Sequence, residues 1–331
     1  MRAAVYAGTG GVEVIAIRDD VAEPVCGSDD ALVTVAYAGL NRADVLERRG
    51  AYPGPKAAVV VPGLEYAGTV TAIGAHVTSV AVGDRVCGLV SAGAHAERLV
   101  AHALTLAKVP AEIDLQTAAA IPETFLTAHD ALFTRGRFAL GEIGLVHTVG
   151  GGVGLAAVSL VQRAGGLALG TSRTPAKLDR AAAFGMTHGF LLDDEWVDRV
   201  QTATNGRGVD VILDFVGPAM LDRNLAVLAP RGRIVQIGML GGARGSLNMG
   251  ALLTKRAELH GTVLRSRGLD EKIALTKQFE RELLPLFARG ELRTQIDSVF
   301  PLAALRDAHA HMERDANFGK ILITLTPPGA A

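Results

Sequence analysis

The chain has 331 residues, of which 49% are hydrophobic, and its 33 basic and 34 acidic side chains leave a net charge of −1. This length and composition allow two buried cores, so we expect two domains rather than one. The nearly neutral charge gives no support to binding of nucleic acid or of an anionic membrane. The two cysteines, Cys26 and Cys87, are far apart and suit reduced thiols in a cytoplasmic protein.

Nothing in the sequence predicts a targeting or membrane segment. Met1 is followed directly by strand-like sequence, and we expect no signal peptide. An uncharged stretch at residues 143–162 reaches the length of a membrane span, but its cluster of glycines predicts a strand, a turn and a buried helix.

The pattern of apolar residues changes along the chain. Residues 1–110 carry short apolar runs, at 31–37, 68–73 and 85–90, which predict a mostly β region. From about Ala118, strand-like and helix-like segments alternate, at 144–148, 153–164, 167–171, 175–184, 209–215, 219–228 and 233–237. Such alternation predicts a parallel sheet covered by helices. A helical stretch at 270–289 and a closing strand at 319–325 follow, and we expect this tail to rejoin the first domain.

The strongest chemical signal is the run Val-His-Thr-Val-Gly-Gly-Gly-Val-Gly at residues 146–154, between an apolar strand and an Ala-rich helix. Glycines there allow a tight turn, a close approach of a pyrophosphate to the backbone, and close packing of helix on sheet. The helix N-terminus offers unpaired N–H groups to phosphate. In the pattern G-x-G-x-x-G, Gly151 and Gly154 fill two positions and Val149 stands at the first.

The end of the second strand of this region bears on the choice between NAD and NADP. An acidic residue there would bind a ribose 2′-hydroxyl, but none occurs before Asp179. Ser172, Arg173 and Lys177 instead offer donors and positive charge suited to a 2′-phosphate, which favours NADP. The alternative is that both cations are solvated residues at the start of a helix.

Short motifs along nearly the whole chain resemble those of the zinc-free quinone oxidoreductases of the medium-chain dehydrogenase/reductase superfamily. They lie at residues 38–52, 62–68, 82–86, 118–128, 208–214, 232–238, 253–256, 264–267 and 317–320. The resemblance implies an α/β protein with a GroES-like, mostly β catalytic domain (1–122 and 265–331) and a Rossmann domain with a doubly wound parallel sheet (123–264). It also implies a homodimer and NADPH in the cleft between the domains.

The resemblance, together with the glycine and cation motifs, also implies the site residues. Those expected at the cofactor are Asn41, Thr127, Gly151, Gly152, Val153, Gly154, Ser172, Arg173, Lys177, Gly238, Met239, Leu264 and Asn317, and Tyr52 is expected to face the nicotinamide. One departure concerns the third Rossmann strand, where the family usually has Asn-Tyr and this chain has Leu191-Leu192. The substitution removes a polar contact near the adenosine phosphate.

No metal is expected. Zinc-dependent relatives need a Cys near position 41 and a Gly-His-Glu in the next segment, whereas this chain has Asn41 and Gly63-Leu64-Glu65. A four-cysteine zinc lobe is impossible with two cysteines. His309 and His311 are two residues apart on a predicted helix and point in different directions, so we expect solvated side chains rather than ligands.

Without a Lewis acid, an acceptor that is already electrophilic needs mainly alignment with the nicotinamide, and quinones and activated enones fit this requirement. Tyr52 and Asn41 are the candidate catalytic residues. Tyr52 is equally compatible with a packing role, and Asn41 with a helix cap. We expect Asp44 and Arg49 to form a structural pair or to be solvated, and Glu65 and His147 to be structural.

The function predicted from the sequence is therefore NADPH-dependent, zinc-independent reduction of quinones. One alternative is an enone or enoyl reductase on the same scaffold, and another is an NADPH-binding structural or redox-sensing protein with little turnover. Hydrolase and kinase functions lack support, because the chain contains neither G-x-S-x-G nor G-x-x-x-x-G-K-[ST].

Overall fold

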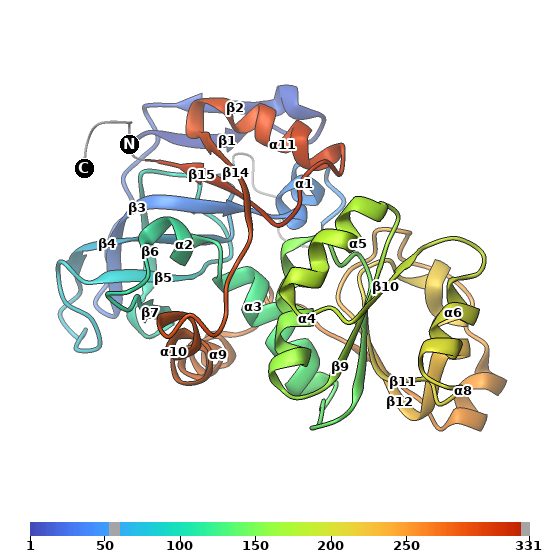
Figure 1. Ribbon diagram of the computed structural model, residues 1–331. Coiled ribbons are helices and arrows are strands. Elements are labelled where there is room, and N and C mark those ends of the chain that lie inside the picture. The colour runs from blue at the N-terminus through green and yellow to red at the C-terminus, as the bar shows by residue number, and fades with distance from the viewer. Residues whose placement is uncertain (53–59, 326–331) are drawn as a thin grey trace. The chain divides into compact units, whose positions relative to one another are not determined.

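The computed structural model describes residues 1–52 and 60–325. The chain forms two compact units (Figure 1). Unit 1 contains Met1–Glu123 and Leu264–Ala331, so it is assembled from both ends of the chain, and unit 2 contains Thr124–Val263.

Unit 1 is built on a seven-stranded sheet. Six strands follow one another in the order β14-β15-β3-β4-β5-β7, and β6 also pairs with β3. The strands are β3 (Asp30–Leu40), β4 (Glu65–Ile73), β5 (Arg85–Leu89), β6 (Arg98–His102), β7 (Leu106–Lys108), β14 (Ile296–Pro301) and β15 (Lys320–Thr324). β15 brings the C-terminal tail antiparallel onto β3, with Leu322 opposite Gly39. β1 (Ala3–Tyr6) and β2 (Ile15–Arg18) form a separate antiparallel pair.

The core of unit 1 follows from the alternation of side chains along β3. Val33 and Val35 are buried, whereas Thr34 between them is exposed, as expected for a strand with one face on the core. The helices of the unit are α1 (Arg42–Arg48), α2 (Leu115–Ala119), α9 (Leu269–Glu282), α10 (Leu284–Ala288) and α11 (Leu305–Glu313). Leu305 and Met312 of α11 join the core cluster on which β3 and β15 pack.

Unit 2 has a six-stranded parallel sheet in the order β10-β9-β8-β11-β12-β13. The strands are β8 (Ile143–Val146), β9 (Leu167–Ser172), β10 (His188–Leu191), β11 (Val209–Asp214), β12 (Leu228–Gln236) and β13 (Glu258–Gly261). The strand order reverses between β8 and β11, and in open parallel sheets ligands bind outside the carboxyl ends of the strands at such a switch point. A ligand site is therefore expected at this edge of the sheet.

Helices cover both faces of the parallel sheet. Figure 1 shows α4 (Gly152–Arg163) and α5 (Pro175–Ala181) on one side, and α6 (Trp196–Ala203) and α8 (Met249–Lys255) on the other. Side chains of α6 and of α7 (Leu221–Val227) form one core cluster with the sheet, and α8 packs against it. Every residue of β11 is buried, which is typical of a strand covered on both faces.

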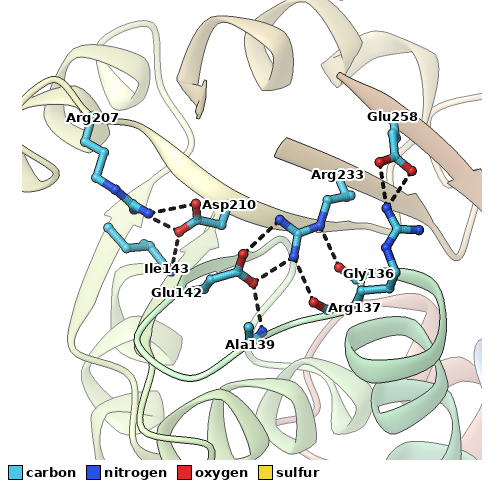
Figure 2. Close-up of polar contacts among 9 residues, drawn as sticks. All are labelled: Gly136, Arg137, Ala139, Glu142, Ile143, Arg207, Asp210, Arg233 and Glu258. Carbon is cyan, nitrogen blue, oxygen red and sulfur yellow. Dashed lines mark hydrogen bonds and ion pairs between the residues drawn. The ribbon is translucent and has the colours of Figure 1, made fainter. Parts of the chain in front are cut away.

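The amino ends of the strands of unit 2 are joined by ion pairs (Figure 2). Arg233 of β12 donates to the carbonyl of Gly136 at 2.7 Å and binds Glu142 through two nitrogens, at 3.0 and 2.7 Å. Asp210 of β11 binds Arg207 and accepts a hydrogen bond from the backbone of Ile143. These contacts fix the loop that precedes β8. The amino edge is thus occupied by structural contacts, and the carboxyl edge remains for a ligand.

The predicted α/β architecture, with a GroES-like domain and a Rossmann domain, is confirmed. The helical stretch predicted at 270–289 is two helices, which break at Leu283 because Pro285 stands in the first turn of the second one. The helix predicted at 175–184 ends at Ala181 and continues as a 3-10 turn to Phe184. Residues 143–162 form β8, a turn and α4, as predicted. Within residues 1–52 and 60–325, no helix combines the length and hydrophobicity that crossing a bilayer requires.

Candidate functional site

The glycine-rich run forms the turn between β8 and α4. Gly151 is the N-cap of α4 and has extended backbone angles. A Cβ on Gly154 would lie 2.7 Å from the Cα of Val149, so α4 can lie against the turn only if this residue is glycine. A Cβ on Gly151 would meet nothing closer than the carbonyl of Thr148 at 3.5 Å. Packing therefore does not explain Gly151, whereas a phosphate that approaches the helix N-terminus does.

Val149 occupies the first glycine position of the motif without disturbing the turn. Its side chain is fully buried and lies against Gly170 of β9, where an added Cβ would be 3.0 Å from Val149 Cγ2. Its backbone N–H donates to the carbonyl of Thr171 at 3.0 Å. A small residue on the neighbouring strand thus makes room for the larger one in the motif.

Positive charge follows β9 at the same edge. Ser172 ends the strand and its hydroxyl accepts a hydrogen bond from Thr174 at 3.0 Å. Arg173 is exposed, and Lys177 on α5 is half-buried. The aliphatic part of Lys177 lies over Gly150, since a Cβ added there would be 2.6 Å from Lys177 Cδ. The glycine turn and Lys177, one of the three predicted 2′-phosphate residues, are therefore neighbours.

The loops after β11 and β12 adjoin each other. The backbone N–H of Ile237 donates to the carbonyl of Asp214 at 2.8 Å, and Leu240 donates to Phe215 at 3.1 Å. Gly238 and Met239 lie between these contacts, and the side chain of Met239 is 50% exposed. Thr127 is buried on α3 (Pro122–His129).

His147, which immediately follows β8, is a fully buried core histidine, as predicted. Its ring nitrogens lie 2.7 Å from the Thr171 hydroxyl and 2.7 Å from Asn224 Oδ1. Burial lowers the pKa of His147, while Asp214 and the hydrogen bond with Asn224 oppose this effect. The ring is held neutral and is not a proton donor at the surface of the site.

In unit 1, Asn41 is part of a buried ionic cluster. Lys320 Nζ donates to Asn41 Oδ1 at 2.7 Å and to the carbonyl of Leu40 at 3.1 Å, and it pairs with the carboxylate of Glu65. Asn41 Nδ2 donates to Glu65 Oε1 at 3.0 Å. Lys320 and Glu65 are 4% and 0% exposed. Because lysine only donates and a carboxylate only accepts, the cluster fixes the orientation of the Asn41 amide.

Asn41 also occupies the N-cap position before α1, one of its two predicted roles, while its side chain is held by Lys320 and Glu65. Its backbone N–H donates to Asp44 Oδ2 at 2.7 Å, and the backbone N–H of Asp44 donates to the Asn41 carbonyl. Burial raises the pKa of Asp44 to about 7, although the Asn41 N–H and Lys320 oppose this rise. Asp44 and Arg49 were expected to pair or to be solvated. They do not pair, because Arg49 lies beyond the end of α1 and binds Glu313 at 2.7 Å; Arg49 is exposed, whereas Asp44 is fully buried.

Tyr52 is half-buried beside Arg265. The Arg265 guanidinium lies 5.1 Å from the centre of the Tyr52 ring, a cation–π contact. Arg265 is itself fixed by an ion pair with Glu47 and by a 2.6 Å hydrogen bond to the Ser91 carbonyl. Burial raises the pKa of the Tyr52 hydroxyl, Glu123 adds to the rise, and Arg265 opposes it. The phenol therefore stays protonated at neutral pH.

The remaining predicted residues of unit 1 are Leu264 and Asn317. Leu264 is 7% exposed, and Asn317 donates from Nδ2 to the carbonyl of Gly319 at 2.9 Å. This contact shapes the turn that leads into β15.

The expectation that His309 is solvated is wrong. His309 is fully buried on α11, 3.4 Å from the hydroxyl of Tyr6, and burial lowers its pKa to about 3. His311 is partly exposed and lies 2.9 Å from Asp297. His95 is also fully buried, with its pKa lowered to about 4 by burial. Among the described residues no group of three His, Cys, Asp or Glu side chains is placed to hold a metal ion.

Unit 2 brings together the glycine turn and Lys177, and it joins the Gly238 loop to the loop after β11. Unit 1 brings Asn41 together with Glu65, and Tyr52 with Arg265. Sequence reasoning assigned no role to Lys320, Arg265 or Asn224. The first two lie in motifs that carried the family resemblance, which was the available signal, whereas nothing local marks Asn224.

Two family models match the chain. One is described as the alcohol dehydrogenase GroES-like domain and matches residues 27–111, and the other is described as zinc-binding dehydrogenase and matches residues 152–287.

Similar proteins cover nearly the whole chain. A quinone oxidoreductase of Lama guanicoe is 31% identical, over 98% of this chain and 98% of its own length. The synaptic vesicle membrane protein VAT-1 homolog of Homo sapiens is 28% identical, over 99% of this chain and 87% of its own length. The structure of Escherichia coli quinone oxidoreductase complexed with NADPH matches with a TM-score of 0.88 and 28% identity, covering 98% of this chain and all of that one.

Proposed function

The chain belongs to the medium-chain dehydrogenase/reductase superfamily of oxidoreductases, and from this premise we propose that it is an NADPH-dependent, zinc-independent quinone oxidoreductase. The observation that carries the proposal is the carboxyl edge of the unit 2 sheet. There, Gly151 leaves the N-terminus of α4 open where packing would accept a side chain, and Lys177 lies over the adjoining glycine. Similarity to quinone oxidoreductases supports the choice of acceptor.

The residues at this edge fit a dinucleotide phosphate. The N–H groups at the start of α4 would hold the pyrophosphate, and Ser172, Arg173 and Lys177 would hold the 2′-phosphate. NADPH, when bound, supplies a hydride. The protein's own groups would align the acceptor, and the protonated hydroxyl of Tyr52 would serve as a proton or hydrogen-bond donor to an acceptor oxygen.

Zinc independence is supported by the chemistry of the cluster around Asn41. An amide stands where zinc relatives have a thiolate, and the Glu65 carboxylate is already compensated by the ammonium of Lys320. The ammonium of Lys320 therefore neutralises the Glu65 carboxylate, which does not need a metal ion to balance its charge. One zinc ion per chain in elemental analysis of active protein would contradict this part of the proposal.

Cofactor choice is tested by the oxidation of NADPH and NADH with a naphthoquinone acceptor after chelator treatment. We expect kcat/KM to favour NADPH by about a hundredfold, and we expect R173A/K177A to lower this ratio to near unity, chiefly by raising KM for NADPH. R163A, which removes a cation from the other end of α4, serves as the control and should leave the ratio unchanged. Equal use of NADH by the wild type would contradict the NADPH assignment.

The acceptor is tested separately, by comparing naphthoquinones with medium-chain enones at saturating NADPH. Comparable or better turnover of quinones supports the proposal, and a preference of about a thousandfold for enones favours the enone reductase instead. Tight NADPH binding without turnover of either acceptor would favour a structural or redox-sensing role.

We also propose that the protein acts as a homodimer, as the family resemblance implies. β13 lies at the edge of the six-stranded sheet, and Leu259 on it is 43% exposed. The neighbouring α8 exposes Leu253 and Met249, at 71% and 57%. An exposed strand edge with apolar neighbours can pair with a second copy.

A further inference from the structure

A buried chain of hydrogen bonds crosses the carboxyl edge of the unit 2 sheet. The Thr171 hydroxyl is 2.7 Å from His147 Nδ1, His147 Nε2 is 2.7 Å from Asn224 Oδ1, and Asn224 Nδ2 donates to Asp214 Oδ2 at 2.8 Å. All four side chains are 0% exposed. These hydrogen bonds connect Thr171 on β9, His147 directly after β8, Asn224 on α7 and Asp214 on β11.

The donors and acceptors in this chain can be arranged in one way. The Asp214 carboxylate only accepts, and its Oδ1 takes the backbone N–H groups of Val216 at 2.6 Å and Gly217 at 2.9 Å. Asn224 must therefore turn its NH2 group to Asp214 and its oxygen to His147. His147 then carries its proton on Nε2 and accepts from Thr171, which agrees with a neutral ring.

The far end of the chain supports the loop that carries Gly238 and Met239. The Asp214 carbonyl accepts the backbone N–H of Ile237 at 2.8 Å and Gln236 Nε2 at 3.0 Å. Gly217 has a φ of +98°, which favours glycine, and the loop turns closely at this residue. A Cβ added to Gly217 would lie 3.1 Å from the carbonyl of Gly242. The position of Asp214 thus sets the position of residues 237–242.

We propose that His147, Asn224 and Asp214 are positioning residues, which fix the loops after β11 and β12 and thereby the Gly238–Met239 wall of the dinucleotide site. The identity of the ligand rests on the proposed function. Four buried polar side chains are a costly way to obtain stability alone, because apolar residues of similar volume would pack at least as well. A single permitted arrangement of hydrogen bonds is, in contrast, suited to holding a loop in one position.

The test is Asn224→Asp, which keeps the size of the side chain and makes the chain of hydrogen bonds depend on pH. The titratable group that faces residue 224 and His147 is Asp214 on β11. The neighbouring elements contribute side chains that carry no charge, Thr171 from β9 and Trp196 from α6. Burial and the nearby carboxylate raise the pKa of the new carboxyl. When protonated, it donates to Asp214 and accepts from His147 as asparagine does; when ionised, it repels Asp214.

We therefore expect the NADPH dissociation constant of N224D, relative to wild type at the same pH, to rise with pH. The ratio should be within about twofold at pH ~6.5 and at least about tenfold at pH ~9. The matched control is S159A, which also removes a buried hydrogen-bonding side chain of unit 2, from α4. Its ratio should stay within about twofold at both pH values.

A ratio for N224D that is the same at both pH values would overturn the proposal. Unfolding of N224D at high pH would also overturn it, because the network would then support the fold rather than position a loop. The fluorescence emission of Trp196, the single tryptophan, reports such unfolding, since the Trp196 ring packs edge-on against His147 with 5.6 Å between the ring centres.

Hydrogen exchange in the absence of cofactor separates this inference from the proposed function. We expect the amides of Val216 and Gly217 to exchange at least about fivefold faster in N224D than in wild type at high pH, with the amides of α4 unchanged. If the wild type binds neither NADPH nor NADH, the proposed function fails and the exchange rates still decide the role of the network. Unchanged exchange at Val216 and Gly217 would refute the positioning role.

Discussion

Single residues in unit 1 show how protein groups can satisfy a charge that is buried inside a fold. The ammonium of Lys320 has an acceptor for each of its three protons, on Asn41, Leu40 and Glu65. The second oxygen of Glu65 accepts the backbone N–H of Glu123 at 2.8 Å. Satisfied in this way, the pair can be buried, and it holds the Asn41 amide in one orientation.

Removal of one charge of the Lys320–Glu65 pair should therefore lower the stability of the protein far more than removal of both charges. We expect K320M to lower the free energy of unfolding by about 3–5 kcal/mol, because Glu65 is left as an uncompensated buried charge. The double variant K320M/E65Q should recover part of this loss, since no ion then remains in the cluster. Urea unfolding measures both values.

K277M is the control for this experiment, because Lys277 forms an exposed pair with Glu280 at 2.8 Å. It should change stability by less than about 1 kcal/mol. If K320M costs no more than K277M, or if the double variant is less stable than K320M, the ion pair does not support the fold as described.

Individual residues also show where prediction from sequence ends. Two roles were predicted for Asn41, a helix cap and a catalytic residue. The structure adds a hydrogen bond from Lys320, which is 279 residues away in the chain. His309 was expected in solvent because it and His311, two residues apart on a helix, point in different directions and cannot share a metal, but α11 places it against Tyr6. Such long-range contacts leave no periodic signal in the local sequence.

At the scale of elements, the β8–α4 turn was predicted well because its chemistry is local. Tight turning, close helix packing and open backbone all require glycine at fixed spacing, and this requirement is visible in any sequence that meets it. The alternation of strands and helices in unit 2 was predicted for the same reason. The strand pairing in the sheet of unit 1 was harder to predict from the sequence, because β15 pairs with a strand that begins 290 residues earlier in the chain.

Two glycines of this turn should respond differently to alanine. In G154A the new Cβ would lie 2.7 Å from Val149 Cα and 2.8 Å from the Thr148 carbonyl, so we expect a loss of about 1–3 kcal/mol in stability. In G151A the nearest atom is 3.5 Å away, and we expect stability within about 0.5 kcal/mol of wild type. NADPH affinity should nonetheless fall at least about tenfold in G151A, because the methyl group blocks the helix N-terminus.

Thermal unfolding and equilibrium titration with NADPH distinguish the two effects. Normal NADPH affinity in a stable G151A protein would mean that the phosphates do not approach this part of the backbone. Unaltered stability of G154A would show that α4 can shift away from the turn.

At the scale of the whole molecule, the parallel sheet of unit 2 ends at β13, which pairs with β12 alone among the described residues. Glu258 on β13 binds Arg137 at 2.6 and 2.7 Å (Figure 2). It also lies 2.9 Å from His260, so polar side chains flank Leu259 on this strand. Leu259 between them is 43% exposed. Paired antiparallel with itself about a two-fold axis, the strand would continue the sheet into a second copy and cover the exposed leucine.

This arrangement predicts a dimer that depends on the backbone of β13. We expect the wild-type protein to sediment as a dimer at micromolar concentration and L259P to sediment as a monomer, because proline cannot donate to a strand pair and disrupts the edge. L253E, which places a charge on the adjoining face of α8, should weaken the dimer by at least about tenfold. V25E alters a side chain of unit 1 that is 88% exposed, and it should leave the dimer intact. A wild-type monomer, or a dimer that survives both L259P and L253E, would assign the edge of the sheet another role.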